Sequence, residues 1–117
     1  MNDPPHCSSP ALEPASLHYE LLAERLRALS HPVRLKVLMR IAGRERCPCG
    51  DIVRDLPKAQ STVSQHLKVL VEAGLLECAP EGQRTHYQIN REALAALRTE
   101  MDVLFAAVMS ANEQDRS

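Results

Sequence analysis

The segment from Ala59 to Gly74 constrains the fold of this chain more than any other stretch. Its apolar residues recur at the period of an α-helix, at Val63, Leu67, Leu70 and Val71. This spacing predicts a helix that packs one side against a core. Gly74 is suited to end that helix, because a left-handed backbone costs glycine little.

The opposite side of this helix is polar in an unusual way. Ordinary surface helices are rich in Glu and Lys, but this side has one Lys and no acid before Glu72. Its side chains are of the kinds that bond to base edges and phosphates, which predicts a DNA recognition helix. Gln65 is best suited to pair with adenine, and Ser64 and Lys68 to contact phosphates. The predicted DNA contacts on this helix are Gln60, Ser61, Thr62, Ser64, Gln65, His66 and Lys68.

Three shorter helices are predicted upstream. The first spans residues 17–29, and the second has Ser30 as its N-cap, Pro32 in its first turn and Gly43 at its end. The third opens around Cys47-Pro48-Cys49 and runs to about residue 56, where a tight turn leads into the recognition helix. Two short helices joined in this way are typical of a helix-turn-helix.

A β-hairpin is predicted after the recognition helix. Residues 75–78 and 85–89 have the character of short strands, separated by a turn segment at 80–84. A hairpin at this place is a wing, and Arg84 near its tip either reaches DNA or is a solvated turn arginine. Cys78, in the first strand, is predicted to be a core residue.

The last predicted helix begins after Asn90, which is suited to cap it. Its apolar positions are spaced like a heptad seam, at Leu94, Leu97, Met101, Leu104, Phe105 and Val108. Such a seam favours contact between two subunits, although it can also pack on its own domain. The predicted fold is therefore mainly α: a winged helix-turn-helix with five helices and a two-stranded wing. The predicted domain spans residues 17–112, between a flexible tail at 1–16 and a short tail at 113–117.

Charge and composition agree with a small DNA-binding protein. With one Phe, two Tyr and no Trp among 117 residues, the core must be aliphatic. The net charge is −1, but residues 25–58 contain nine bases against three acids, directly ahead of the recognition helix. No apolar run approaches a membrane span and no signal pattern opens the chain, so a cytoplasmic location is expected. In that compartment the four cysteines favour metal binding, redox chemistry or burial over disulfides.

The run from Leu26 to Ile89 resembles the ArsR/SmtB family of bacterial winged-helix transcriptional repressors. The matching stretches are Ala28-Leu29-Ser30-His31-Pro32-Val33-Arg34-Leu35, Cys47-Pro48-Cys49-Gly50-Asp51-Ile52, Ser61-Thr62-Val63-Ser64-Gln65-His66-Leu67-Lys68-Val69-Leu70 and Ala73-Gly74-Leu75-Leu76. The resemblance implies a homodimer that binds palindromic double-stranded operator DNA until an inducer releases it.

In metal-sensing members of the family, a Cys-x-Cys at the start of the third helix binds soft ions. Cys47 and Cys49 stand at that place, with Pro48 where the family usually has an apolar residue. If Cys47 is the N-cap, its backbone is not helical, and the helix N-terminus is expected to favour the thiolate. As(III) or Sb(III) is the favoured inducer, and Cd or Pb is possible; no zinc site is expected in the last helix, which lacks His.

Two sulfurs do not complete such a site, because trigonal coordination needs a third ligand. Cys7 is the candidate, since the ten residues from Cys7 to Leu17 can stretch to roughly 33 Å. Three other hypotheses stay open at this point. Cys47 and Cys49 can form a redox or sulfur-species switch in the same repressor, or the winged helix can bind protein instead of DNA. A thiol-oxidoreductase enzyme is disfavoured, because there is no Cys-x-x-Cys and no βαβ pattern.

Overall fold

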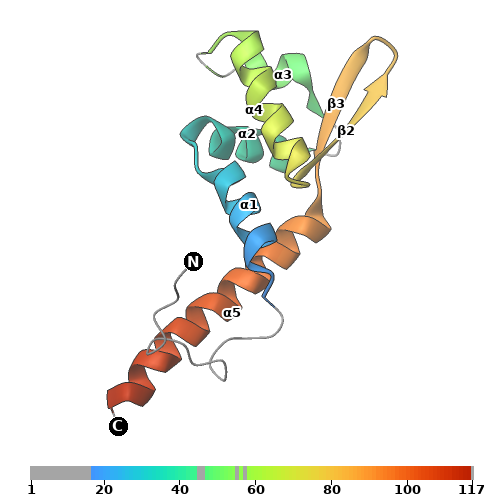
Figure 1. Cartoon of the computed structure of the whole chain (residues 1–117). Helices are drawn as coiled ribbons and strands as arrows, with labels where there is room; N and C mark the ends of the chain where they lie inside the picture. Colours follow the sequence, from blue (N-terminus) through green and yellow to red (C-terminus); the bar gives the residue numbers. More distant parts are fainter. Residues whose placement is uncertain (1–16, 45–46, 55, 57, 117) are drawn as a thin grey trace.

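The computed structural model describes residues 17–44, 47–54, 56 and 58–116, with side chains up to residue 111. The predicted tail at 1–16 lies outside this range. The elements follow in the order α1 (Tyr19–Leu29), α2 (Pro32–Ala42), β1 (Cys47–Pro48), α3 (Cys49–Arg54), α4 (Gln60–Glu72), β2 (Leu76–Glu81), β3 (Arg84–Ile89) and α5 (Arg91–Arg116) (Figure 1). The predicted five helices and two-stranded wing are confirmed, and the sheet gains a third short strand.

The core is aliphatic, as the composition predicted, and α4 contributes three residues of its apolar stripe, while Val71 is half-buried at the edge. Its side chains Val63, Leu67 and Leu70 are fully buried. They lie against fully buried side chains from α2, α3 and the chain that enters β2, among them Val37, Ile41, Ile52, Leu75 and Leu76. Burying each of these side chains is worth about 1.5–3 kcal/mol, so this cluster fixes α4 against the body of the domain.

The sheet is antiparallel in the order β1-β3-β2, and β2 and β3 form the wing. Gly82 has a φ of 65° and Gln83 has no positive φ, the pattern of a two-residue type II′ turn. The prediction that Cys78 is a core residue is wrong, because the structure leaves it exposed. Leu76 and Cys78 share one face of β2. The hairpin projects away from the helices (Figure 1), so Leu76 at its base is buried and Cys78 is not.

The ends of the helices are defined by specific hydrogen bonds. The N-cap of α2 is His31 and not the predicted Ser30: the His31 Nδ1 accepts from the Val33 backbone N–H, whereas the Ser30 hydroxyl donates to the Arg27 carbonyl at the end of α1. After α4, Gly74 has a φ of 82°, as predicted. The bonds from Leu75 N to Leu70 O and from Gly74 N to Val71 O complete a Schellman motif.

The helix α5 divides into two parts. Its first half packs on the domain through Ala93 and Leu97, which are buried. The second half projects from the body of the molecule and leaves Phe105, Val108 and Met109 exposed (Figure 1). The helical backbone continues to Arg116, beyond the predicted boundary at residue 112. Within the described part of the chain, no helix combines the length and apolar character that a bilayer span requires.

Candidate DNA-binding surface and cysteine site

The predicted DNA-contacting residues of α4 differ in their exposure. Gln60, Ser61, Gln65 and Lys68 are exposed, which leaves their polar groups free to meet a ligand. Thr62, Ser64 and His66 are half-buried beside the core stripe. The outward side of α4 thus presents two glutamines, a serine and a lysine in a row that a major groove can accept.

A hollow of about 580 Å³ lies between α3, the start of α4 and the wing. It brings together residues of the predicted DNA surface and of the predicted ion site. Its lining includes Gln60, Ser64 and Arg84 from the predicted DNA surface and Cys49 from the predicted ion site. Arg54 of α3 also lines it, so two guanidinium groups border the same space. A chemical change at Cys49 therefore takes place beside side chains that were predicted to contact DNA.

His66 is held from inside the protein. The Arg34 Nε donates a hydrogen bond to the His66 Nδ1 at 3.2 Å, and the rings of His31 and His66 lie with their centroids 4.3 Å apart. Burial, His31 and Arg34 lower the pKa of His66 below its ordinary value of 6.5, and Lys58 adds to the effect. Arg34 is one of the nine bases counted ahead of the recognition helix, but it is half-buried and bonds to another helix.

Cys47 and Cys49 lie on either side of the junction between β1 and α3. Cys47 is in a strand, not at a helix N-cap, and pairs in register with Tyr87 of β3. Its side chain is fully buried, whereas Cys49 is half-buried. Because residues i and i+2 on a regular helix point about 200° apart, the extended backbone at Cys47 removes one obstacle to a shared ligand.

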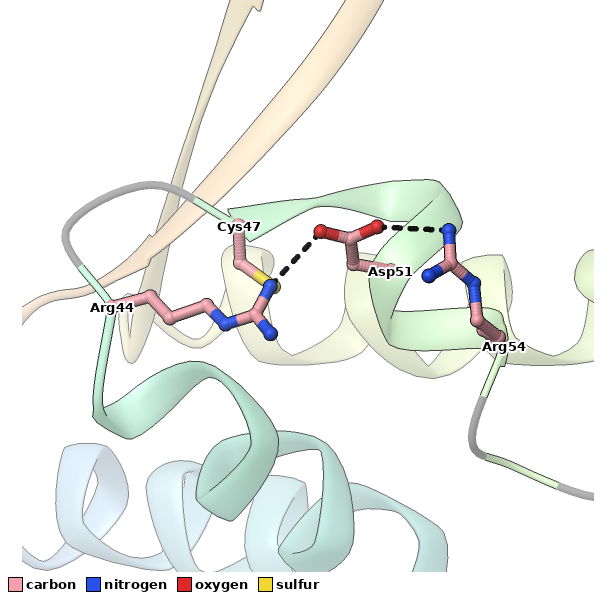
Figure 2. Close-up of polar contacts among 4 residues, drawn as sticks. All are labelled: Arg44, Cys47, Asp51 and Arg54. Carbon is pink, nitrogen blue, oxygen red and sulfur yellow. Dashed lines mark hydrogen bonds and ion pairs between the residues drawn. The ribbon is translucent and has the colours of Figure 1, made fainter.

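A chain of polar contacts begins at the Cys47 thiol (Figure 2). The Arg44 Nη1 approaches the Cys47 Sγ at 3.9 Å and also bonds to the Asp51 Oδ2 at 2.9 Å. The other carboxylate oxygen of Asp51 accepts from the Arg54 Nη2 at 3.3 Å. These three charged residues were not predicted to belong to the site. Their contacts link the segment before β1 to α3, and Arg54 continues to the hollow.

The environment of Cys47 opposes thiolate formation. Burial raises the pKa of the Cys47 thiol above its ordinary value, and the nearby Arg44 guanidinium only partly offsets this effect. The prediction that a helix N-terminus lowers this pKa is therefore wrong for Cys47, which precedes α3 and is covered by the core. A divalent cation that binds this thiol must displace its proton, so such binding must depend on pH.

The described residues supply two soft ligands and not a complete ion site. No group of three or more Cys, His, Asp or Glu suited to hold a metal occurs among them. The predicted third ligand, Cys7, lies outside the described range. Two thiols separated by one proline fit a soft, thiophilic ion in chemistry. A hard ion is not matched by this donor set.

Comparison with known proteins agrees with this arrangement. Residues 29–79 match the family model described as a helix-turn-helix domain. The chain is 38% identical over 88 residues to the HTH-type transcriptional regulator Rv2034 of Mycobacterium tuberculosis, covering 75% of this chain and 81% of that protein. It is 32% identical over 88 residues to the arsenical resistance operon repressor of Staphylococcus xylosus, covering 75% and 84%.

A solved structure gives the same fold. The ArsR-like transcriptional regulator from Rhodococcus sp. RHA1 superposes with a TM-score of 0.70 at 22% identity, covering 82% of this chain and 92% of that one. The relatives are transcriptional regulators, in agreement with the expectation that the chain is not an enzyme. From its sequence relatives, its helix-turn-helix and its wing, the chain belongs to the ArsR/SmtB family of winged-helix transcriptional repressors.

Proposed function

We propose that this protein is a homodimeric repressor that leaves its operator when a thiophilic ion binds Cys47 and Cys49. The observation that carries the proposal is the shared hollow. Cys49 lines it together with Gln60 and Ser64 of the recognition helix and Arg84 of the wing. An ion that draws the two thiols together must move the β1–α3 junction, and that movement acts directly on the surface that meets DNA.

The predicted DNA contacts have distinct roles in this proposal. Exposed Gln65 reads base edges, Lys68 contacts a phosphate, and Arg84 reaches the backbone or the minor groove from the wing. Gln60, Ser61, Thr62 and Ser64 complete the contact surface at the start of α4. His66 belongs to the surface by position, although its ring is held by Arg34.

Arsenite or antimonite is the proposed ion, and cadmium or lead is an alternative. Support comes from the donor type and from the arsenical resistance operon repressor of S. xylosus, a relative that carries its function in its name. Cys7 is the proposed third ligand. As arsenite or antimonite binds, the Cys47 proton leaves with one hydroxide of the oxyacid as water, whereas a divalent ion displaces the proton to the solvent. In both cases Arg44 favours the thiolate.

The two halves of the dimer are proposed to meet through α5 and α1. Phe105 and Val108 are 55% and 57% exposed, and Leu21 and Tyr19 on α1 add further exposed apolar surface. Isolated chains rarely leave aromatic and aliphatic side chains of one projecting helix in water. A second copy of this chain, laid against the same surface in a two-fold arrangement, covers them. The protein then acts as a DNA-binding dimer in the cytoplasm.

The proposal is tested by release of DNA from the reduced protein. A fluorescent duplex selected from a randomised library with the wild-type protein is bound, and arsenite, antimonite, cadmium or lead is added. Release by one ion that disappears in the Cys47→Ser/Cys49→Ser double variant is the expected result. Cys78→Ser is the matched control, because that thiol is exposed and lies outside the site. Release that persists in the double variant refutes the proposed ion site.

A redox or sulfur-species switch at the same cysteines is the second candidate. It is favoured by the ligand count, because two thiols suffice for a disulfide or polysulfide bridge but not for trigonal coordination, and no third ligand occurs among the described residues. Polysulfide added to the same assay separates the two candidates. Release by polysulfide with none by arsenite assigns the cysteines to the switch.

A further inference from the structure

Arg34 occupies the point where three helices meet. From α2, its Nη1 donates to the carbonyl oxygens of Arg27 and Ala28 at the end of α1, at 3.2 and 3.4 Å. Its Nε donates to the His66 Nδ1 of α4 at 3.2 Å. One guanidinium therefore contacts the last carbonyls of α1 and the middle of the recognition helix at the same time.

The bond to His66 requires one form of the imidazole. Because the Nδ1 accepts from Arg34, the ring must be neutral with its proton on Nε2. The neighbouring His31 ring supports this arrangement from the side, and its own Nδ1 is occupied by the Val33 N–H. The ionisable groups that act on His66 are His31, Arg34 and Lys58, and all three oppose its protonation.

We propose that Arg34 is a positioning residue that fixes the recognition helix relative to α1 through His66. The consequence depends on the dimer of the proposed function, because α1 contacts α5 and both helices form the proposed subunit interface. A rigid connection from that interface to each recognition helix sets the distance between the two recognition helices. That distance must match the spacing of the two operator half-sites.

The test compares two duplexes: the one selected with the wild-type protein, and a variant with one base pair inserted between its half-sites. The wild-type dimer is expected to prefer the first strongly. Arg34→Met keeps the aliphatic stem but loses the donors, and His66→Leu removes the acceptor from the other side. The measured quantity is the affinity for the selected duplex divided by the affinity for the duplex with the insertion. Both variants are expected to lower this ratio by about tenfold, the effect of one hydrogen bond to a charged group.

Two controls separate positioning from direct contact. His66→Asn supplies an acceptor oxygen close to the place of the Nδ1 and is expected to restore the ratio. Lys68→Ala removes a proposed phosphate contact, so it should weaken both duplexes equally and leave the ratio unchanged. Both duplexes contain the same half-sites, so any contact that His66 itself makes with DNA cancels in the ratio of the two affinities. Thermal unfolding of each variant confirms that it is folded under the assay conditions.

Acid pH provides a readout that a purely structural role does not move. The pKa of His66 is lowered, so its neutral form and the bond to Arg34 persist above pH 6.5 and are lost as pH falls through the lowered value. The spacing preference of the wild type should therefore decrease as pH falls through the pKa of His66, whereas the preference of His66→Asn should not change. Nitrogen NMR of the imidazole should place the neutral proton on Nε2.

The failures of the two proposals are distinguishable. A wild-type protein that sediments as a monomer refutes the dimer and this inference with it. A wild-type dimer with no spacing preference refutes the inference alone. A preference that survives in both Arg34→Met and His66→Leu refutes the inference and leaves the dimer intact. A proton on Nδ1 of neutral His66 refutes the inference whatever the oligomeric state.

Discussion

The Asn90 side chain joins the end of the recognition helix to the start of α5. Its Nδ2 donates to the Gly74 carbonyl at 3.0 Å, and its Oδ1 accepts from the Ala93 N–H, which caps α5. The backbone N–H of Asn90 adds a bond to the Leu75 carbonyl. One residue thus connects the end of α4 to the helix that carries the proposed dimer surface.

Asn90→Ala is expected to lower the free energy of unfolding by about 1–2 kcal/mol, because it removes the cap of α5 together with the bond to Gly74. Asn90→Asp is the matched control, since it keeps the capping acceptor and loses only the donor. Urea denaturation should show that the aspartate variant recovers most of the loss. Equal destabilisation by the two variants would contradict the capping role.

Gly74→Ala is expected to cost about 1–2 kcal/mol of stability, the penalty for an L side chain in the left-handed region. A Cβ at this position meets nothing within 4 Å, so the cost comes from the backbone alone. Gly43→Ala is the comparison, because Gly43 has a φ of −89° and equally open surroundings. That variant should be neutral or stabilised by up to about 1 kcal/mol. The same loss at both positions would show that the left-handed backbone is not the cause.

Phe105→Ser is expected to weaken the dimer by roughly 10- to 100-fold, the scale of a buried aromatic anchor. Sedimentation velocity over a range of concentrations measures the shift toward monomer. Met39→Ser is the control, because Met39 is 77% exposed on α2, a helix outside the proposed interface. If the wild-type protein is monomeric, or if both variants dimerise equally, α5 is not the interface.

The apparent affinity for a divalent ion such as cadmium should rise with pH. Burial raises the pKa of the Cys47 thiol, so cadmium must displace its proton at neutral pH, and each proton released contributes up to about tenfold per pH unit. Arg44→Met removes the cation that favours the thiolate, so it should weaken ion binding at neutral pH and less so at alkaline pH. Arg54→Met is the control for Arg44→Met, because it breaks the other ion pair of Asp51 without touching Cys47. A pH-independent cadmium affinity would contradict binding through this thiol.

The sequence was sufficient for the recognition helix and wing, because their patterns are local. The apolar stripe of α4, the glycine at its end and the capping Asn90 each depend on neighbours within a few residues. Cys78 was misplaced because strand alternation gives the face of a side chain and not how far the hairpin extends past the core. The two-residue strand β1 is too short to have a period.

The remaining features depend on contacts that are distant in sequence. Arg34 and His66 meet only after α2 and α4 pack together, and nothing near Arg34 in the sequence marks it as a partner of the recognition helix. Cys47 is buried because β1 pairs with β3. Its partner in the register is Tyr87, which lies forty residues later in the sequence. The burial of Cys47 reverses the direction of the pKa shift that the local sequence suggested.

The coupling between ion binding and DNA binding is tested most directly by measuring it from both sides. Arsenite affinity is determined for the reduced protein alone and for the protein saturated with its selected duplex, and DNA affinity is determined with and without arsenite. Arsenite and DNA are expected to weaken each other's binding by the same factor, within the usual range of about 5 to 150. Arsenite that binds equally well with and without DNA would contradict this coupling.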